Sequence, residues 1–160
     1  MKVTRNLIRE YYGIPDGETV AYSYVNAGFV KCNEDNSAKV DKTTFIGDVN
    51  ATCAVTGYEN GWEYEAQYVK GDPVVDDLAS IAREQKIGAD CERLLVSVDM
   101  TAPVEGEPGV YSARKALIAV EAAPPSGDPK SVTTLSGTFH QTGDLTLGTF
   151  DVGLKVFTAL

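Results

Sequence analysis

Residues Trp62–Tyr68 read WEYEAQY, a strict alternation of apolar and polar side chains. Successive side chains of a β-strand point to opposite faces, so the aromatic residues and the alanine share one face. Glu63 and Glu65 share the other face with the glutamine. This pattern predicts a strand with one buried face and one face in water.

A helix is predicted to follow this strand, from Asp72 to Gly88. Asp72 suits the N-cap, and Pro73 suits the first helical position, where its missing N–H costs nothing. The apolar residues of the segment recur at helical spacing and span about 120° of the helix surface. Gly88 supplies the left-handed residue that often follows a helix. We therefore expect one helix that packs on a sheet along a single stripe.

Strand patterns dominate the rest of the chain, and turns rich in glycine and proline separate several of them at 103–109 and 124–129. The predicted strands are Val20–Val30, Leu94–Met100, Val110–Glu121, Val132–His140 and Leu154–Ala159. We expect a single domain over residues 1–160 of the mainly β (α+β) class. Its expected form is a β-sandwich or small barrel with one flanking helix. Residues 1–18 are expected to form an extended arm, and residues 33–42 a mobile loop.

Composition narrows the function class. The chain has 160 residues, of which 43% are hydrophobic and 23% charged, with a net charge of −9. Such an acidic chain lacks the basic footprint with which proteins grip nucleic acid. The three cysteines have no CxxC spacing, which argues against a disulfide framework and a zinc site. No apolar run approaches the roughly 20 residues of a membrane span, and no secretory signal is visible, so we expect a cytosolic protein.

Catalytic patterns are missing as well. His140 is the single histidine, and neither a GxSxG elbow nor an HExxH pair is present. Glu63 and Glu65 lie about 6.6 Å apart along their strand, which is loosely compatible with the paired acids of a glycosidase. Adjacent acids on an alternating strand are more typical of its solvated face. We expect no enzymatic activity, cofactor or metal, and a protein that binds or assembles.

The segment Ala116–Val120 is apolar on both faces of its predicted strand. A sheet with one solvated face does not require this pattern. Either the helix covers the second face or another subunit does, and both explanations fit the sequence. Leu117, Ile118 and Val120 are therefore candidate subunit-interface residues.

The order of these pieces resembles the major tail tube protein of long-tailed bacteriophages of Gram-positive hosts. The similarity is strongest over residues 43–121 and 131–160, and the short segment from Leu7 to Tyr12 is weakly similar too. A departure lies at the last predicted hairpin, where many relatives carry proline after Gly143-Asp144 and this chain has Leu145. The segments that carry the resemblance are Val55-Thr56-Gly57-Tyr58, Trp62–Tyr68, Gly71-Asp72-Pro73, Ile87-Gly88-Ala89-Asp90, Leu94–Met100, Ser136-Gly137-Thr138, Gly148-Thr149-Phe150-Asp151 and Phe157-Thr158-Ala159.

The resemblance implies a β-sandwich subunit flanked by a helix, six copies of which form a ring. Stacked rings would make the hollow tail tube of a virion, through which DNA is ejected. Tubes of contractile tails, phage-derived bacteriocins and type VI secretion share this architecture. The implied partners are further copies of the chain and the tape measure, tail terminator and distal tail or baseplate proteins. Assembly would take place in the host cytoplasm, without membrane insertion.

Three features acquire a role under this resemblance. A neighbouring subunit would bury the segment 116–120, and the next ring would order the arm and the loop. An acidic lumen would repel the DNA phosphates, so that DNA slides without specific binding. Glu59, Glu63 and Glu65 are the candidates for that lumen surface, and an exterior location for them is almost as well supported.

The alternative comes from a different functional class. A monomeric β-sandwich binding module, of the carbohydrate-binding or baseplate type, would present exposed aromatic side chains on a fixed platform. Tyr58, Trp62 and Tyr64 would be its candidates, although the alternation at 62–68 favours a buried position for the last two.

Overall fold

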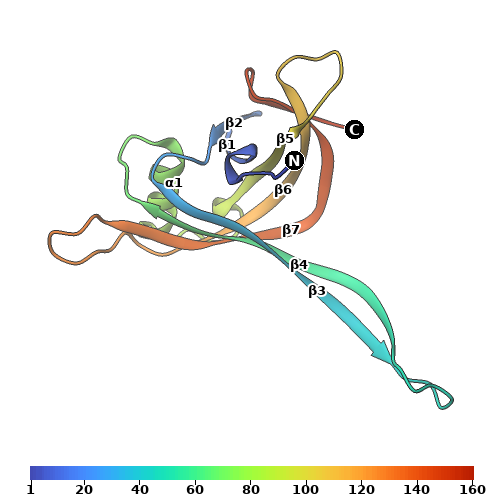
Figure 1. Ribbon diagram of the computed structural model, residues 1–160. Coiled ribbons are helices and arrows are strands. Elements are labelled where there is room, and N and C mark those ends of the chain that lie inside the picture. Colours follow the sequence, from blue (N-terminus) through green and yellow to red (C-terminus); the bar gives the residue numbers. More distant parts are fainter.

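The computed structural model describes all 160 residues and shows eight strands in one antiparallel sheet, in the order β2-β1-β5-β6-β7-β4-β3, with β8 paired to β7. The fold is β-rich with a single α-helix, which confirms the predicted class (Figure 1). Two short 3₁₀ helices, Arg5–Leu7 and Gly88–Cys91, complete it. The elements are β1 (Ile8–Asp16), β2 (Thr19–Tyr24), β3 (Phe29–Thr43), β4 (Thr52–Gln67), α1 (Pro73–Arg83), β5 (Glu92–Pro103), β6 (Val110–Ala122), β7 (Thr134–Asp151) and β8 (Val156–Ala159).

The sheet coils so strongly that strands distant in its order face one another. β1 and β7 are separated by two strands, yet the rings of Tyr12 and Phe139 are 5.7 Å apart and those of Tyr11 and Phe150 are 4.5 Å apart. Tyr11 and Tyr12 are consecutive, so they point to opposite faces of β1. One ring meets β7 on one side of the sheet and the other ring meets β7 on the other side. The sandwich-like layering is thus built from one continuous sheet.

The main core lies between the helix and one face of this sheet. Trp62, Tyr64 and Ala66 are buried there, while Glu63 and Glu65 are exposed, as the alternation predicts. The cluster also takes in Tyr12, Val74, Leu78, Ile81, Leu95, Ile118 and Phe139. A smaller cluster on the opposite face contains Tyr11, Val96, Val98, Ala113 and Phe150.

Helix α1 begins as predicted and ends earlier. The Asp72 carboxylate accepts hydrogen bonds from the backbone N–H groups of Val74 (2.9 Å) and Val75 (3.3 Å). The helix ends at Arg83, not at Gly88, because Gln85 adopts a positive φ of 52°. The Lys86 N–H then bonds back to the Ile81 carbonyl at 3.1 Å, which is the pattern of a Schellman motif. The prediction of the C-terminal end was wrong because glutamine occupies the left-handed position that glycine usually takes.

A buried ion pair fixes α1 to the sheet. The Asp77 carboxylate accepts hydrogen bonds from Arg93 Nε (2.9 Å) and Nη2 (3.2 Å) on β5, and from the Tyr12 hydroxyl (2.6 Å) on β1. The side chains of Asp77 and Arg93 are only 13% and 10% exposed. Burial, and then the neighbouring carboxylate, raises the pKa of the Tyr12 hydroxyl far above its usual value, so this group remains a donor.

Two predicted irregular segments are strands. Residues 8–16, expected within an N-terminal arm, form β1 between β2 and β5, because Tyr11 and Tyr12 bury their rings on opposite faces of the sheet. Residues 33–42, expected to form a loop, belong to β3 and pair with β4. The polar composition that suggested a loop reflects a strand exposed on both faces.

The last predicted hairpin is also different. β7 runs without interruption through Gly143-Asp144, so no turn forms there. Instead, its pairing with β6 slips: Lys115 pairs with Thr146 and Leu117 with Thr142. Gly143 takes a positive φ of 75° within this bulge, which agrees with the ability of glycine to adopt such angles.

Candidate functional site

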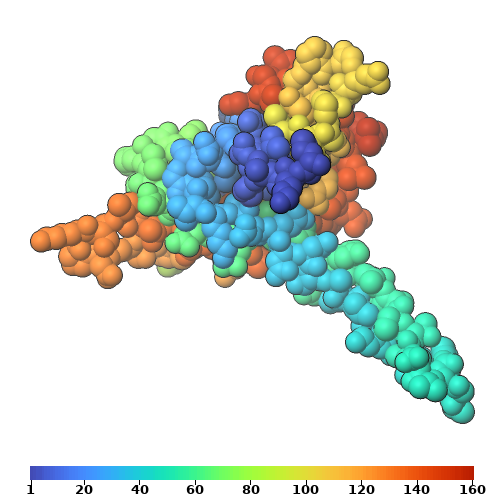
Figure 2. Space-filling model, viewed as in Figure 1, coloured from blue at the N-terminus to red at the C-terminus, as the bar shows by residue number.

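A long ribbon, the outer half of the β3–β4 hairpin, extends away from the body of the molecule (Figures 1 and 2). Residues 33–43 pair with 52–63, and β4 meets β7 only from Gly61 onward. The outer ribbon, 36–43 with 52–60, therefore has no third strand beside it. Almost every side chain along this ribbon is exposed on both faces.

The tip of this ribbon, residues 44–51, carries three exposed large apolar side chains. Phe45 is 62% exposed, Val49 is 97% exposed and Ile46 is fully exposed. A tight turn holds them, in which the Asp48 N–H donates to the Phe45 carbonyl at 3.0 Å. An isolated two-stranded hairpin is marginally stable in water, and clustered exposed apolar side chains mark interaction sites. The tip is therefore a candidate contact surface for another molecule.

The base of the ribbon is anchored, in contrast to its tip. Arg114 on β6 donates two hydrogen bonds to the Glu34 carboxylate, at 3.1 and 2.7 Å. Asn60 donates to Glu34 and to Gln141, both at 2.9 Å. Burial acts to raise the pKa of Glu34, but the hydrogen bonds from Arg114 and Asn60 outweigh it and hold this pKa below its usual value. The ribbon thus projects from a fixed polar base.

The three predicted acidic residues share one exposed face of β4. Glu59 lies 2.8 Å from Lys39 Nζ, and Glu63 lies 2.9 Å from Lys31 Nζ. The hydrogen bond from Lys39 lowers the pKa of Glu59. Glu65 has no ion-pair partner. Two of the three charges are thus partly neutralised within the chain.

The same face continues across the neighbouring strands. Directly paired residues of antiparallel strands lie on one face, and the registers place Asp35 and Glu121 on the face of Glu59, Glu63 and Glu65. These five carboxylates and the two lysines that pair with Glu59 and Glu63 sum to a formal charge of −3. His140 Nε2 lies 2.7 Å from Glu121 Oε2. A polar hollow of about 520 Å³ opens on this face beside Asp35, Glu59 and His140.

The structure corrects the predicted interface. Ile118 is 0% exposed and Val120 6% exposed, because both pack in the core under α1. The choice between helix and neighbouring subunit is therefore decided for these two residues in favour of the chain's own core. Leu117 points to the opposite face and is 37% exposed, so it stays a candidate contact residue.

The surface also lacks the aromatic platform of the alternative function. Trp62 and Tyr64 are each 1% exposed and belong to the main core, so neither can stack on a sugar. Tyr58 is 63% exposed but stands without them. Glu63 and Glu65 lie on an open strand face, without the apolar enclosure that tunes a glycosidase acid.

No group of three or more histidine, cysteine, aspartate or glutamate side chains is placed to hold a metal ion. The three cysteines are free, with Cys32 buried and Cys53 exposed. None of the helices has the length and apolar character needed to cross a membrane.

The sequence patterns did not predict two features, one of the candidate contact surface and one of the fold. The apolar tip was missed because Phe45-Ile46-Gly47 is too short to show a period, although apolar residues between two strand-like segments were a usable signal. The pair Asp77–Arg93 was missed because its members lie 16 residues apart on different elements. Only the docking of α1 on β5 brings them together.

No protein-family model and no curated protein sequence matches the chain. Among solved structures, a subunit of the SPP1 tail tube is similar with a TM-score of 0.67 and 12% identity, over 90% of this chain and 78% of that one. A chain of the anti-feeding prophage baseplate is similar with a TM-score of 0.56 and 9% identity, over 92% of this chain and 95% of that one. The chain therefore shares the fold of phage tail tube and baseplate proteins.

Proposed function

We propose that this protein is a structural subunit of a phage tail or tail-like particle, and that its copies assemble into rings that stack into a hollow tube. Hexameric rings and passage of DNA through the tube follow from the same resemblance. The host group suggested by the sequence, Gram-positive bacteria, stays part of the proposal. So do the partners, namely tape measure, tail terminator and distal tail or baseplate proteins.

The main observation in support of this proposal is the exposed ribbon. A strand pair that extends beyond its sheet, with Phe45, Ile46 and Val49 uncovered at its tip, gains little from its own chain. It gains stability once another molecule covers the tip, because burial of a large apolar side chain contributes about 1.5–3 kcal/mol. The shared fold with tail tube and baseplate subunits supports a further copy of the chain as the covering molecule.

The acidic face supports the second half of the proposal. Its net −3 charge, repeated in every copy of a ring, would repel phosphate and let DNA slide. Glu65, which has no lysine partner, would contribute most to this effect, and Glu59 and Glu63 less. The absence of an assembled catalytic group around His140 or Glu63 fits a structural role.

Concentration-dependent assembly tests the proposal directly. The purified protein is concentrated, and negative-stain electron microscopy and analytical ultracentrifugation follow its state. We expect tubes or rings with a central hole for the wild type, and a folded monomer for Ile46→Asp. Lys42→Ala, on the same hairpin beside the tip, is the matched control and should assemble.

A different result would contradict the proposal. If the wild type stays monomeric at high concentration and binds sugars saturably, the chain is a binding module. If Ile46→Asp assembles as well as the wild type, the ribbon tip is not the contact that drives assembly.

A further inference from the structure

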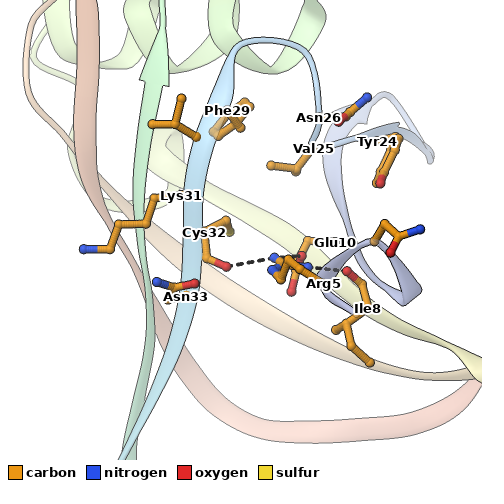
Figure 3. Close-up of a pocket in the computed structure, with 12 residues that line it drawn as sticks. Arg5, Ile8, Glu10, Tyr24, Val25, Asn26, Phe29, Lys31, Cys32 and Asn33 are labelled. Carbon is orange, nitrogen blue, oxygen red and sulfur yellow. Dashed lines mark hydrogen bonds and ion pairs between the residues drawn. The ribbon is translucent and has the colours of Figure 1, made fainter. Parts of the chain in front are cut away.

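A pocket of about 360 Å³ lies at the opposite end of the β3–β4 hairpin from its tip (Figure 3). Three chain segments line it: residues 5–10, the turn after β2 at 24–26, and the start of β3 at 29–33. Half of its lining residues are hydrophobic, among them Ile8, Val25 and Phe29. Its size lies near the lower end of the range of about 300–1,000 Å³ for binding pockets, which is suitable for one or two large side chains.

The walls of the pocket are held in place by hydrogen bonds. The Arg5 guanidinium donates to the carbonyl of Ile8, to the Glu10 carboxylate at 2.7 Å and to the Cys32 carbonyl at 2.9 Å. These bonds join the N-terminal segment to both β1 and β3, as Figure 3 shows. The Val25 N–H donates to the Glu10 carbonyl at 2.9 Å. The pocket is therefore a built feature of the fold that the chain itself leaves unfilled.

We propose that this pocket receives the hairpin tip of a second copy of the chain. This inference rests on the proposed assembly and names the surface that the tip contacts. Phe45 and Ile46 are large apolar side chains without cover at the tip, and the hydrophobic half of the pocket lining, with Ile8, Val25 and Phe29, offers them apolar contacts. The charges agree as well: Asp48 at the tip has no ion-pair partner, and the pocket lining carries two cations, Arg5 and Lys31, against one carboxylate, Glu10.

The positions of tip and pocket determine the kind of assembly. Both surfaces lie on one hairpin but at opposite ends, so a copy cannot place its tip in its own pocket. Tip-in-pocket contact is heterologous, and such contacts propagate without an end unless the rotation between copies closes a ring. Each copy keeps one free tip and one free pocket for the next, which suits growth along a tube.

The hairpin also limits the repeat of the assembly. From Cys32 in the pocket to Phe45 at the tip, the chain advances by 13 residues, or about 43 Å at about 3.3 Å per residue. The step between successive copies along the tube axis cannot exceed the distance from pocket to tip. We therefore expect an axial repeat no larger than about 43 Å.

Photocrosslinking in assembled protein tests the contact. Position 46 is replaced by p-benzoylphenylalanine in ¹⁵N-labelled protein, which is mixed with unlabelled wild type, assembled and irradiated. Mass spectrometry should find adducts between labelled and unlabelled copies at residues 5–10 or 24–33. A pocket-filling variant, Asn26→Trp on the exposed rim, should raise the critical concentration for assembly at least tenfold. Asn26→Ala, which leaves the pocket open, should assemble like the wild type.

Each result separates this inference from the proposed function. Three results would overturn the pocket assignment and leave tube assembly intact. They are adducts that map elsewhere, normal assembly of Asn26→Trp, and an axial repeat that clearly exceeds about 43 Å. Failure of the wild type to assemble at all would overturn the proposed function, and the pocket assignment with it.

Discussion

Replacement of Asp77 by alanine should release α1 from the sheet. The variant leaves the Arg93 guanidinium, whose side chain is 10% exposed, without a counter-ion, and the buried Tyr12 hydroxyl without its acceptor. Two backbone carbonyls, those of Asp90 and Glu92, still accept from Arg93 Nη1, but Nε and Nη2 lose their partner. Removal of one member of a buried ion pair costs about 3–5 kcal/mol.

Urea unfolding followed by tryptophan fluorescence measures this loss, because Trp62 lies in the core beneath the helix. With a slope of about 2 kcal/mol per molar urea, the midpoint should fall by roughly 1.5–2.5 M. Asp76→Ala is the matched control one residue away. Its carboxylate accepts only from the Gly71 N–H, at 3.1 Å on the surface, so its loss should stay below about 1 kcal/mol.

The double variant Asp77→Leu/Arg93→Met completes the test. Replacement of both charges by apolar groups of similar size removes the unpaired guanidinium, so part of the lost free energy of unfolding should return. Equal losses for Asp77→Ala and Asp76→Ala, or no recovery in the double variant, would refute the view that this ion pair anchors α1.

The remaining predictions concern the strand at 116–120 and the pocket. Ile118→Ala should lower the free energy of unfolding by about 2–5 kcal/mol through loss of core packing. Leu117→Ala, on the other face, should lower it by about 1 kcal/mol or less. Thermal unfolding measures both losses, and equal losses would contradict the assignment of faces. Burial raises the pKa of Glu10 despite the opposing effect of Arg5. The folded state therefore binds a proton at Glu10 more strongly than the unfolded state does. As a result, stability falls as pH rises from the ordinary glutamate pKa through the raised one. The free energy of unfolding of Glu10→Gln, minus that of the wild type, should therefore rise between pH 4 and 7 in denaturant titrations; a flat difference would argue against the buried carboxylate.

Local sequence patterns predicted much of the fold. The alternation at 62–68 depends only on the two-residue period of a strand, so the buried face of β4 could be predicted. The start of α1 depends on Asp72 and Pro73, which act on the nearest N–H groups. Its end could not be predicted as well, because Gln85 takes a left-handed conformation that its residue type does not favour.

Contacts between segments distant in the sequence could be identified only from the tertiary structure. Tyr11 and Tyr12 looked like part of an arm until β2 and β5 were seen to pair on either side of β1. The apolar segment at 116–120 was compatible with two burial partners, and only the position of α1 decides between them for Ile118 and Val120.

Charge and apolar content were visible in the sequence, but their exposure was not. The sequence by itself determined an acidic, β-rich domain with one helix, because those properties follow from composition and from short periods. The tertiary structure alone decided that Phe45 and Ile46 stand uncovered at the end of a ribbon, and that a pocket lies open at the other end of the same hairpin. Whether a side chain is covered depends on segments far away in the chain, and no local pattern contains that information.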